Sequence, residues 1–174
     1  NTAEKLLTFI KDSPTAFQAV ETMKNRFSEN GFRELKEEEH WSVEKGGKYF
    51  VTRNHSAIIA FTIPEENTDT FHIIASHSDS PSLKIKENPE MAENGYVKLN
   101  VELYGGALLA PWFDRPLSVA GRLIVKEAGK ICEKLVTVDR DMLIIPNLAI
   151  HMNREANSGY QYNVQKDMLP LYGL

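Results

Sequence analysis

Cysteine and clustered positive charge are both scarce in this sequence. Cys132 is the single cysteine, so no disulfide can form within the chain, and this usage is typical of the cytoplasm, where we expect the protein. The formal net charge is −4 and no basic cluster stands out. This disfavours nucleic acid as a partner, because phosphate neutralisation requires clustered Lys and Arg.

Long apolar runs are also absent. No run approaches the roughly 20 residues that a membrane-spanning helix requires. The segment Asn1–Lys5 lacks the basic and then apolar order of a secretory signal. We therefore expect no membrane partner. With 42% hydrophobic and 25% charged residues, the composition is that of a globular protein, and the length suffices for one ordinary domain or two small ones.

The hydrophobic pattern changes near residue 90. Residues 1–90 show helical and then strand periodicity, whereas residues 91–174 show mostly strand periodicity, with the breaker-rich Glu87–Glu90 between them. The sequence therefore predicts an α/β protein with a boundary near residue 90.

Two helices are expected at the N-terminus, the first ending near Asp12. Ser13 and Pro14 suit the N-cap and first position of the second helix, which should stop at Asn30 and Gly31. The expected strands cover residues 49–53, 56–63, 71–76, 96–103, 117–126 and 134–138.

His77 and Asp79 follow the apolar run Phe71–Ser76. Such a run predicts a buried strand, and functional residues gather at the carboxyl ends of strands in α/β sheets. Residues two apart in an extended chain point to the same side, so both side chains should face one cavity. A carboxylate fixes the tautomer of a metal-bound imidazole. Metal-assisted hydrolysis is therefore the first hypothesis, and a purely structural histidine is the alternative.

His151 follows Leu148–Ile150 at a second strand-like end, so it is either a functional or a structural histidine. Serine-based hydrolysis is a second chemistry, although the sequence has no Gly-x-Ser-x-Gly elbow. The remaining histidines are interpreted as structural: His40, His55 and His72.

The segment Trp112–Pro116 follows the double glycine Gly105-Gly106. This double glycine lacks the spacing of a phosphate-binding loop, which argues against nucleotide binding. Trp, Phe and Arg are frequent at protein interfaces. The segment therefore forms either an interface or a packed loop between strands.

Several of these segments, in this order and spacing, resemble the M18 family of metalloaminopeptidases, the aspartyl aminopeptidase and aminopeptidase I group. The resemblance runs through essentially the whole chain. It is carried by Ser13–Phe17, Lys48–Asn54, Ile58–Phe61, His77–Pro81, Glu102–Gly106, Trp112–Arg115 and Pro146–His151.

The resemblance implies that residues 1–90 begin an α/β zinc-peptidase domain, and that residues 91–174 are part of an inserted, mostly β domain that mediates homo-oligomerisation. It also implies that His77 binds one of two zinc ions and that Asp79 orients it. His151 would be the inserted domain's histidine, with a catalytic and metal-associated role. The substrates would be peptides with a free N-terminus, including those with an acidic first residue.

The family's other metal carboxylates, its glutamate base and its last histidine ligand lie downstream of the inserted domain, whereas this sequence stops at Leu174. The resemblance therefore implies an incomplete chain that is inactive alone. Two interpretations without catalysis stay open: an assembly or regulatory module of the same fold, and a binding domain in which His77 and Asp79 are structural.

Overall fold

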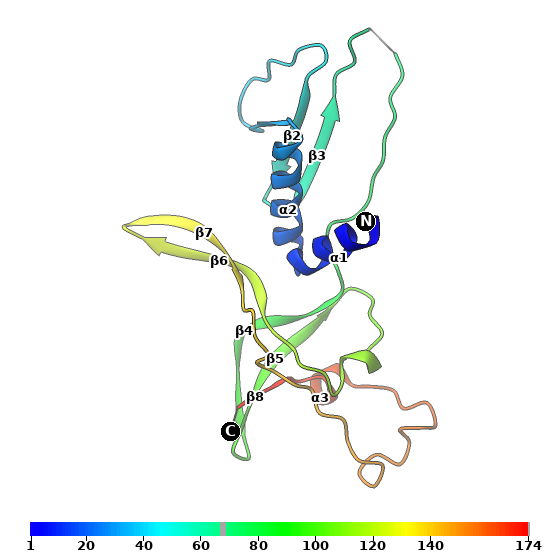
Figure 1. Cartoon of the computed structure of the whole chain (residues 1–174). Coiled ribbons are helices and arrows are strands. Elements are labelled where there is room, and N and C mark those ends of the chain that lie inside the picture. The colour runs from blue at the N-terminus through cyan, green and yellow to red at the C-terminus, as the bar shows by residue number, and fades with distance from the viewer. Residues whose placement is uncertain (67–68, 174) are drawn as a thin grey trace. The chain divides into compact units, whose positions relative to one another are not determined.

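A computed structural model describes residues 1–66 and 69–173 of the chain (Figure 1). The chain forms two compact units. The first unit contains Asn1–Ser80 and Ala120–Thr137, and the second contains Pro81–Val119 and Val138–Leu174. Each unit is therefore built from segments that are separated in the sequence.

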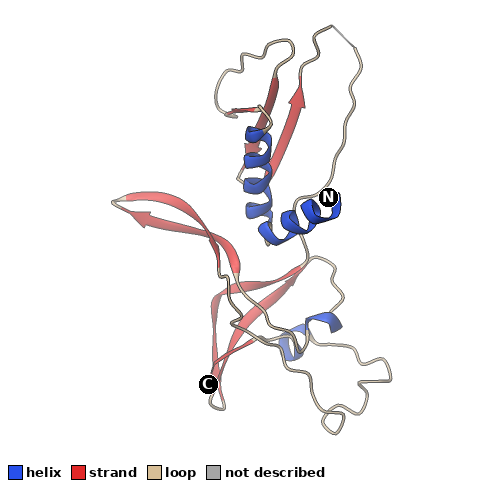
Figure 2. Ribbon diagram, in the orientation of Figure 1, coloured by secondary structure: helices blue, strands red, loops and turns tan. Residues whose placement is uncertain are grey.

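Two helices, α1 (Thr2–Asp12) and α2 (Ala16–Glu29), begin the first unit (Figure 2). Both helices were expected, but the predicted N-cap of α2 is wrong. Thr15 is the N-cap, and its side chain accepts a hydrogen bond from the Phe17 backbone N–H, whereas Ser13 is the C-cap of α1. Pro14 thus precedes the cap, where its missing N–H costs no helical hydrogen bond.

The first unit also contains a three-stranded sheet in the order β1-β2-β3. The strands are β1 (Arg33–Leu35), β2 (Lys48–Arg53) and β3 (Ala57–Thr62). β1 pairs parallel to β2, and β2 pairs antiparallel to β3. Asn54 and His55, both at φ 51°, make the turn of the predicted hairpin. The core contains Val20 of α2 and Tyr49 and Phe50 of β2, all buried.

The strand predicted for residues 71–76 is wrong. This segment is an extended coil, drawn as part of a long tan loop in Figure 2. Phe71 is 87% exposed, Ile73 84% and Ile74 100%. Its composition is that of a buried strand, but a strand exists only where another strand satisfies its backbone groups. The sheet order shows no neighbour for it among the described residues.

The second unit has an antiparallel sheet in the order β4-β5-β8. Its strands are β4 (Ser82–Glu93), β5 (Tyr96–Tyr104) and β8 (Leu171–Gly173). β4 runs through the breaker-rich stretch because the pairing register shifts between Ile85 and Glu90, so Pro89 sits where the ladder is interrupted. The predicted division near residue 90 thus falls inside β4.

The rest of the second unit consists of connecting segments with a 3-10 turn, Ala110–Trp112, and a short helix, α3 (Val164–Asp167). Isolated bridges join Leu117 to Leu143 and Ile144 to Leu171. Among the described residues of this unit, the largest fully buried side chains are Val101, Ile145 and Met168.

A two-stranded antiparallel hairpin, β6 (Ala120–Glu127) with β7 (Lys130–Thr137), belongs to the first unit. The amide nitrogen of Gln18 on α2 donates to the carbonyl oxygens of Gly121 at 3.3 Å and Val136 at 3.1 Å. The Arg122 guanidinium lies 4.1 Å from the centre of the Phe17 ring. Among the described helices, none is long and apolar enough to cross a membrane.

Candidate functional site

The first candidate pair, His77 and Asp79, lies near the end of the coil that follows β3. The Nδ1 atom of His77 is 2.9 Å from the Asp79 Oδ1 atom and 2.9 Å from the Asp79 backbone oxygen. The structure thus brings together the side chains of His77 and Asp79, as their spacing in the sequence predicted. In the neutral ring, the two oxygens at Nδ1 favour the tautomer with the proton on Nδ1, which leaves a lone pair on Nε2.

The pair is accessible and its loop is tethered. The His77 side chain is 80% exposed and that of Asp79 43%. Between them, the Ser78 hydroxyl donates to the Ser56 carbonyl oxygen at 2.8 Å, which fixes the coil to the residue just before β3. The sequence therefore presents an oriented imidazole at the surface of the first unit.

This arrangement fits one ligand position of a zinc site. Zinc binds neutral imidazole nitrogen, and a ligand histidine commonly donates its other N–H to a carboxylate or carbonyl oxygen. Within residues 1–66 and 69–173, no group of three or more His, Cys, Asp or Glu side chains is placed to hold a metal ion. His77 thus contributes one oriented nitrogen, and the described residues do not complete a metal site around it.

His151 lies in the second unit, in an exposed turn. The Ala149 carbonyl oxygen accepts from the backbone N–H groups of Met152 at 2.8 Å and Asn153 at 3.2 Å. The expected strand-like end before His151 is therefore wrong. Pro146 interrupts the apolar run because it cannot donate a ladder hydrogen bond, and the chain turns instead.

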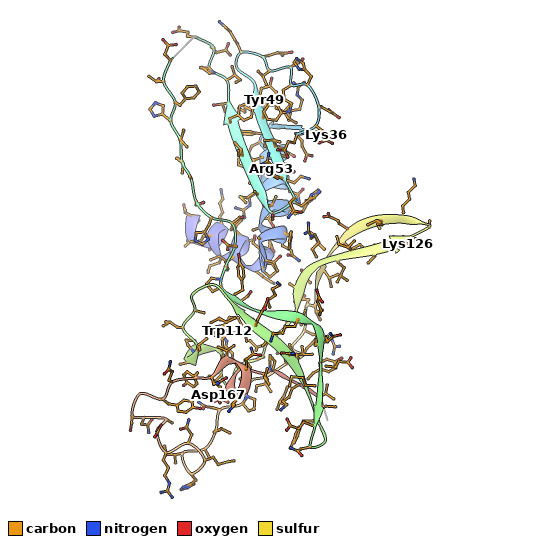
Figure 3. All side chains as sticks on the ribbon, turned by 180° about the vertical axis from the view of Figure 1, so that it is seen from behind. Lys36, Tyr49, Arg53, Trp112, Lys126 and Asp167 are labelled. Atoms are coloured by element: carbon orange, nitrogen blue, oxygen red, sulfur yellow. The ribbon has the colours of Figure 1, made fainter. Side chains whose placement is uncertain are left out.

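A cluster of aromatic and polar side chains near this turn was missed by the sequence analysis. Asp167 of α3, labelled in Figure 3, accepts from the Tyr160 hydroxyl at 3.0 Å and from the Asn163 backbone N–H at 2.7 Å. The hydrogen bond to Asp167 raises the pKa of Tyr160 above its ordinary value. A cavity of about 190 Å³ is lined by Tyr160, Asp167 and Pro146–Leu148, among others. Only the alternating Tyr160 and Tyr162 hinted at this cluster.

The segment Trp112–Pro116 packs within the second unit. The Phe113 ring centre lies 4.9 Å from that of Tyr162, and Asp114 Oδ1 accepts from the Asn147 backbone N–H at 2.8 Å. Earlier in the chain, Gly105 has φ +76°, and a Cβ there would lie 3.4 Å from the Pro81 Cα atom. These contacts fit the packed-loop interpretation, the interface interpretation stays a prediction, and the glycine serves backbone geometry.

Comparisons with known proteins assign a class to this chain. Residues 9–174 match the family described as aminopeptidase I zinc metalloprotease (M18). A probable M18 family aminopeptidase 2 of Clostridium acetobutylicum is 52% identical over 177 residues, which cover 99% of this chain and 41% of that protein. The chain therefore spans about two fifths of the length of the curated relatives that it matches.

Solved structures agree. The complex of Ape4 and Nbr1 matches 99% of this chain and 34% of its own chain, with 42% identity and a TM-score of 0.94. Chaetomium thermophilum mApe1 matches 98% of this chain and 40% of its own, with 37% identity and a TM-score of 0.87. The dodecamer of S. cerevesiae mApe1 matches 99% of this chain and 38% of its own chain, with 25% identity and a TM-score of 0.79.

Fold and sequence together define a chain of zinc metalloprotease type, with mixed helices and sheets that match those of M18 aminopeptidases. The chain belongs to the M18 family. The resemblance found from its motifs is thereby confirmed.

Proposed function

We propose that this chain is part of a zinc-dependent aminopeptidase that removes N-terminal residues from peptides, including peptides with an acidic first residue. The observation that carries the proposal is the His77 imidazole, held through Nδ1 by Asp79, with a side chain that is 80% exposed, in a chain of a zinc metalloprotease family.

The residues of the chain take distinct roles in this proposal. His77 binds zinc through Nε2, and Asp79 holds the ring by accepting its Nδ1–H, which raises the basicity of the ligand nitrogen. His151 contacts the substrate or the metal as a catalytic residue. A pair of zinc ions, when bound, supplies a polarised peptide carbonyl and an activated water.

The remaining ligands and a glutamate base come, in this proposal, from the portion of the relatives' length that this chain does not span. That portion is more than half of the Clostridium acetobutylicum relative. The 174-residue chain alone is then inactive. Residues 1–90 begin the peptidase domain, and residues 91–174 are part of an inserted domain that assembles copies of the protein. The dodecamer of S. cerevesiae mApe1 supports such assembly.

A pair of histidine variants tests the zinc role in a protein of the relatives' full length that carries this sequence. His77→Ala should lose bound zinc and peptide hydrolysis, because the oriented ligand nitrogen is removed. His72→Ala is the matched control, since His72 lies exposed in the same coil and should leave both quantities unchanged. Zinc is measured by elemental analysis, and hydrolysis with peptides of acidic and neutral first residues. Unchanged zinc content and rate in His77→Ala would overturn the proposal.

A non-catalytic assembly module of the same fold is the second candidate. It is favoured by the apolar side chains exposed on the β6–β7 hairpin, including Ile124 at 59% and Ile131 at 78%. The same experiment separates the two functions, because an assembly module would bind no zinc and release no N-terminal residue while still associating.

A further inference from the structure

Asp114 makes two hydrogen bonds to the segment that leads to His151. Its backbone N–H donates to the Ile145 carbonyl oxygen at 2.9 Å, and its Oδ1 atom accepts from the Asn147 backbone N–H at 2.8 Å. Pro146, between these two residues, has no N–H to offer. Asp114 therefore holds the backbone on both sides of the proline.

One end of this contact is fixed in the core of the second unit. Ile145 is fully buried. Two residues earlier, Leu143 and Leu117 exchange two backbone hydrogen bonds. The Leu117 N–H donates to the Leu143 carbonyl oxygen at 2.9 Å, and the Leu143 N–H donates to the Leu117 carbonyl oxygen at 3.1 Å. The backbone that bears Asp114 is therefore held against the same segment at Leu117, which gives the carboxylate a defined position.

The other end of the contact leads into the exposed turn. The Asn147 side-chain oxygen accepts from the Leu148 N–H at 3.0 Å. The Ala149 carbonyl then closes the turn that contains His151, through the N–H of Met152. Asp114 thus joins a buried residue to the start of the turn that carries the histidine.

The backbone of Asp114 has a conformation that most residues avoid. Its φ is 56°, in the left-handed region where Asp and Asn are enriched because their short polar side chains bond locally. Strained backbone of this kind persists where the surrounding contacts require it, often beside functional sites.

We propose that Asp114 is a positioning residue for His151: its hydrogen bond to Asn147 sets the path by which the turn presents the imidazole. The proposal rests on the catalytic role proposed for His151, and goes beyond it by naming the group that orders its loop. Asp114 does not itself touch the substrate; it acts through the backbone of residues 145–147.

Three substitutions at one position separate the hydrogen bond from the backbone strain. Asp114→Asn keeps an acceptor oxygen and tolerates positive φ. Asp114→Ala loses the acceptor, and Asp114→Gly loses the acceptor but relieves the strain. Asp139→Ala, at an exposed site of the same unit, is the control.

Amide hydrogen exchange of the 174-residue chain is the first measurement. The Asn147 amide should exchange roughly three- to tenfold faster in Asp114→Ala and Asp114→Gly, as expected for the loss of one hydrogen bond. In Asp114→Asn and Asp139→Ala, the exchange rate of the Asn147 amide should stay near that of the unmodified chain. The exchange rates of the amides in the β4-β5 ladder should not change in any variant. Equal exchange at Asn147 in all variants would overturn the proposal, as would a uniform rise at every amide, which indicates general destabilisation.

The second measurement is the steady-state kinetics of a protein that carries this sequence and has the full length of the relatives. Asp114→Ala and His151→Ala should each lower kcat by about tenfold or more, as misplacement of a catalytic group does. The double variant should be no slower than His151→Ala, and Asp114→Asn should restore most of the rate. An equal further loss from Asp114→Ala in the His151→Ala background would overturn the proposal. Full activity of His151→Ala would instead overturn the role of His151, while the exchange of Asn147 still decides whether Asp114 orders the turn.

Discussion

Replacing Asp79 tests how much the orientation of the His77 ring contributes to zinc binding, because His77 itself stays in place. Asp79→Asn keeps an oxygen near Nδ1, 2.9 Å away in the unmodified protein, but removes the negative charge that makes the ring a better ligand. We expect zinc affinity of the full-length protein to fall by about 10- to 100-fold, as for other carboxylate partners of metal-bound histidine. Competition with a coloured chelator measures this affinity.

The matched control for this change is Asp69→Asn, which removes the same charge earlier in the same coil. It should leave zinc affinity near that of the unmodified protein. An equal loss in both variants would mean that net charge, and not the hydrogen bond to His77, controls zinc binding.

Contacts within a few residues were within reach of the sequence, whereas contacts between distant residues were not. His77 and Asp79 are two residues apart, and the alternation of side chains in extended backbone sufficed to bring them together. Asp114 and Asn147 are 33 residues apart, and no local pattern links them. Tyr160 and Asp167 are only seven residues apart, but their contact depends on a one-turn helix in a tail without clear periodicity, so it was missed as well.

At the scale of elements, Gln18 links the β6–β7 hairpin to α2. Gln18 is 7% exposed, and its amide donates to backbone oxygens of both hairpin strands. Gln18→Ala leaves these half-buried carbonyl groups without the Gln18 donor, so we expect the free energy of unfolding to fall by about 1–3 kcal/mol. Urea denaturation of the 174-residue chain measures this quantity.

Gln161→Ala is the control for that substitution, because Gln161 is exposed. Its unfolding free energy should stay within about 0.5 kcal/mol of the unmodified chain. If Gln18→Ala were as stable as this control, the hydrogen bonds to the hairpin would contribute nothing measurable.

Elements with local signals were predicted well. Both helices, the β2–β3 hairpin and β5 follow from helical spacing, turn residues and strict alternation. The run at residues 71–76 was predicted wrongly because apolar composition records a tendency to be buried but does not supply the neighbouring strand. β4 was interpreted as a break because a bulge that accommodates Pro89 depends on the pairing with β5.

At the scale of the whole chain, the two compact units interleave in the sequence. Residues 120–137 leave the second unit and pack with the first, through contacts such as that of Arg122 with Phe17. A boundary drawn along the sequence cannot represent such an exchange, because composition changes gradually while contacts are made between distant residues. The assignment of residues 1–90 and 91–174 to two domains therefore stays a prediction.

The exposed apolar side chains of the chain predict its behaviour in solution. Phe71, Ile73 and Ile74 are 84–100% exposed in an extended segment, and contiguous exposed apolar surface drives association. We expect the 174-residue chain to associate increasingly with concentration, as sedimentation velocity would show. Ile73→Ser with Ile74→Ser should reduce the associated fraction, because both apolar side chains are replaced by polar ones.

A double substitution on α1, Leu6→Ser with Leu7→Ser, is the control for this association, because these leucines are also exposed, at 58% and 66%. If both double variants reduced association equally, apolar exposure in general would be responsible and not the extended segment. If the unmodified chain sedimented as a monomer at all concentrations, the prediction would be contradicted. If only the Ile73 and Ile74 substitutions weakened association, residues 71–76 would be identified as a segment that pairs as a strand when a neighbour is supplied.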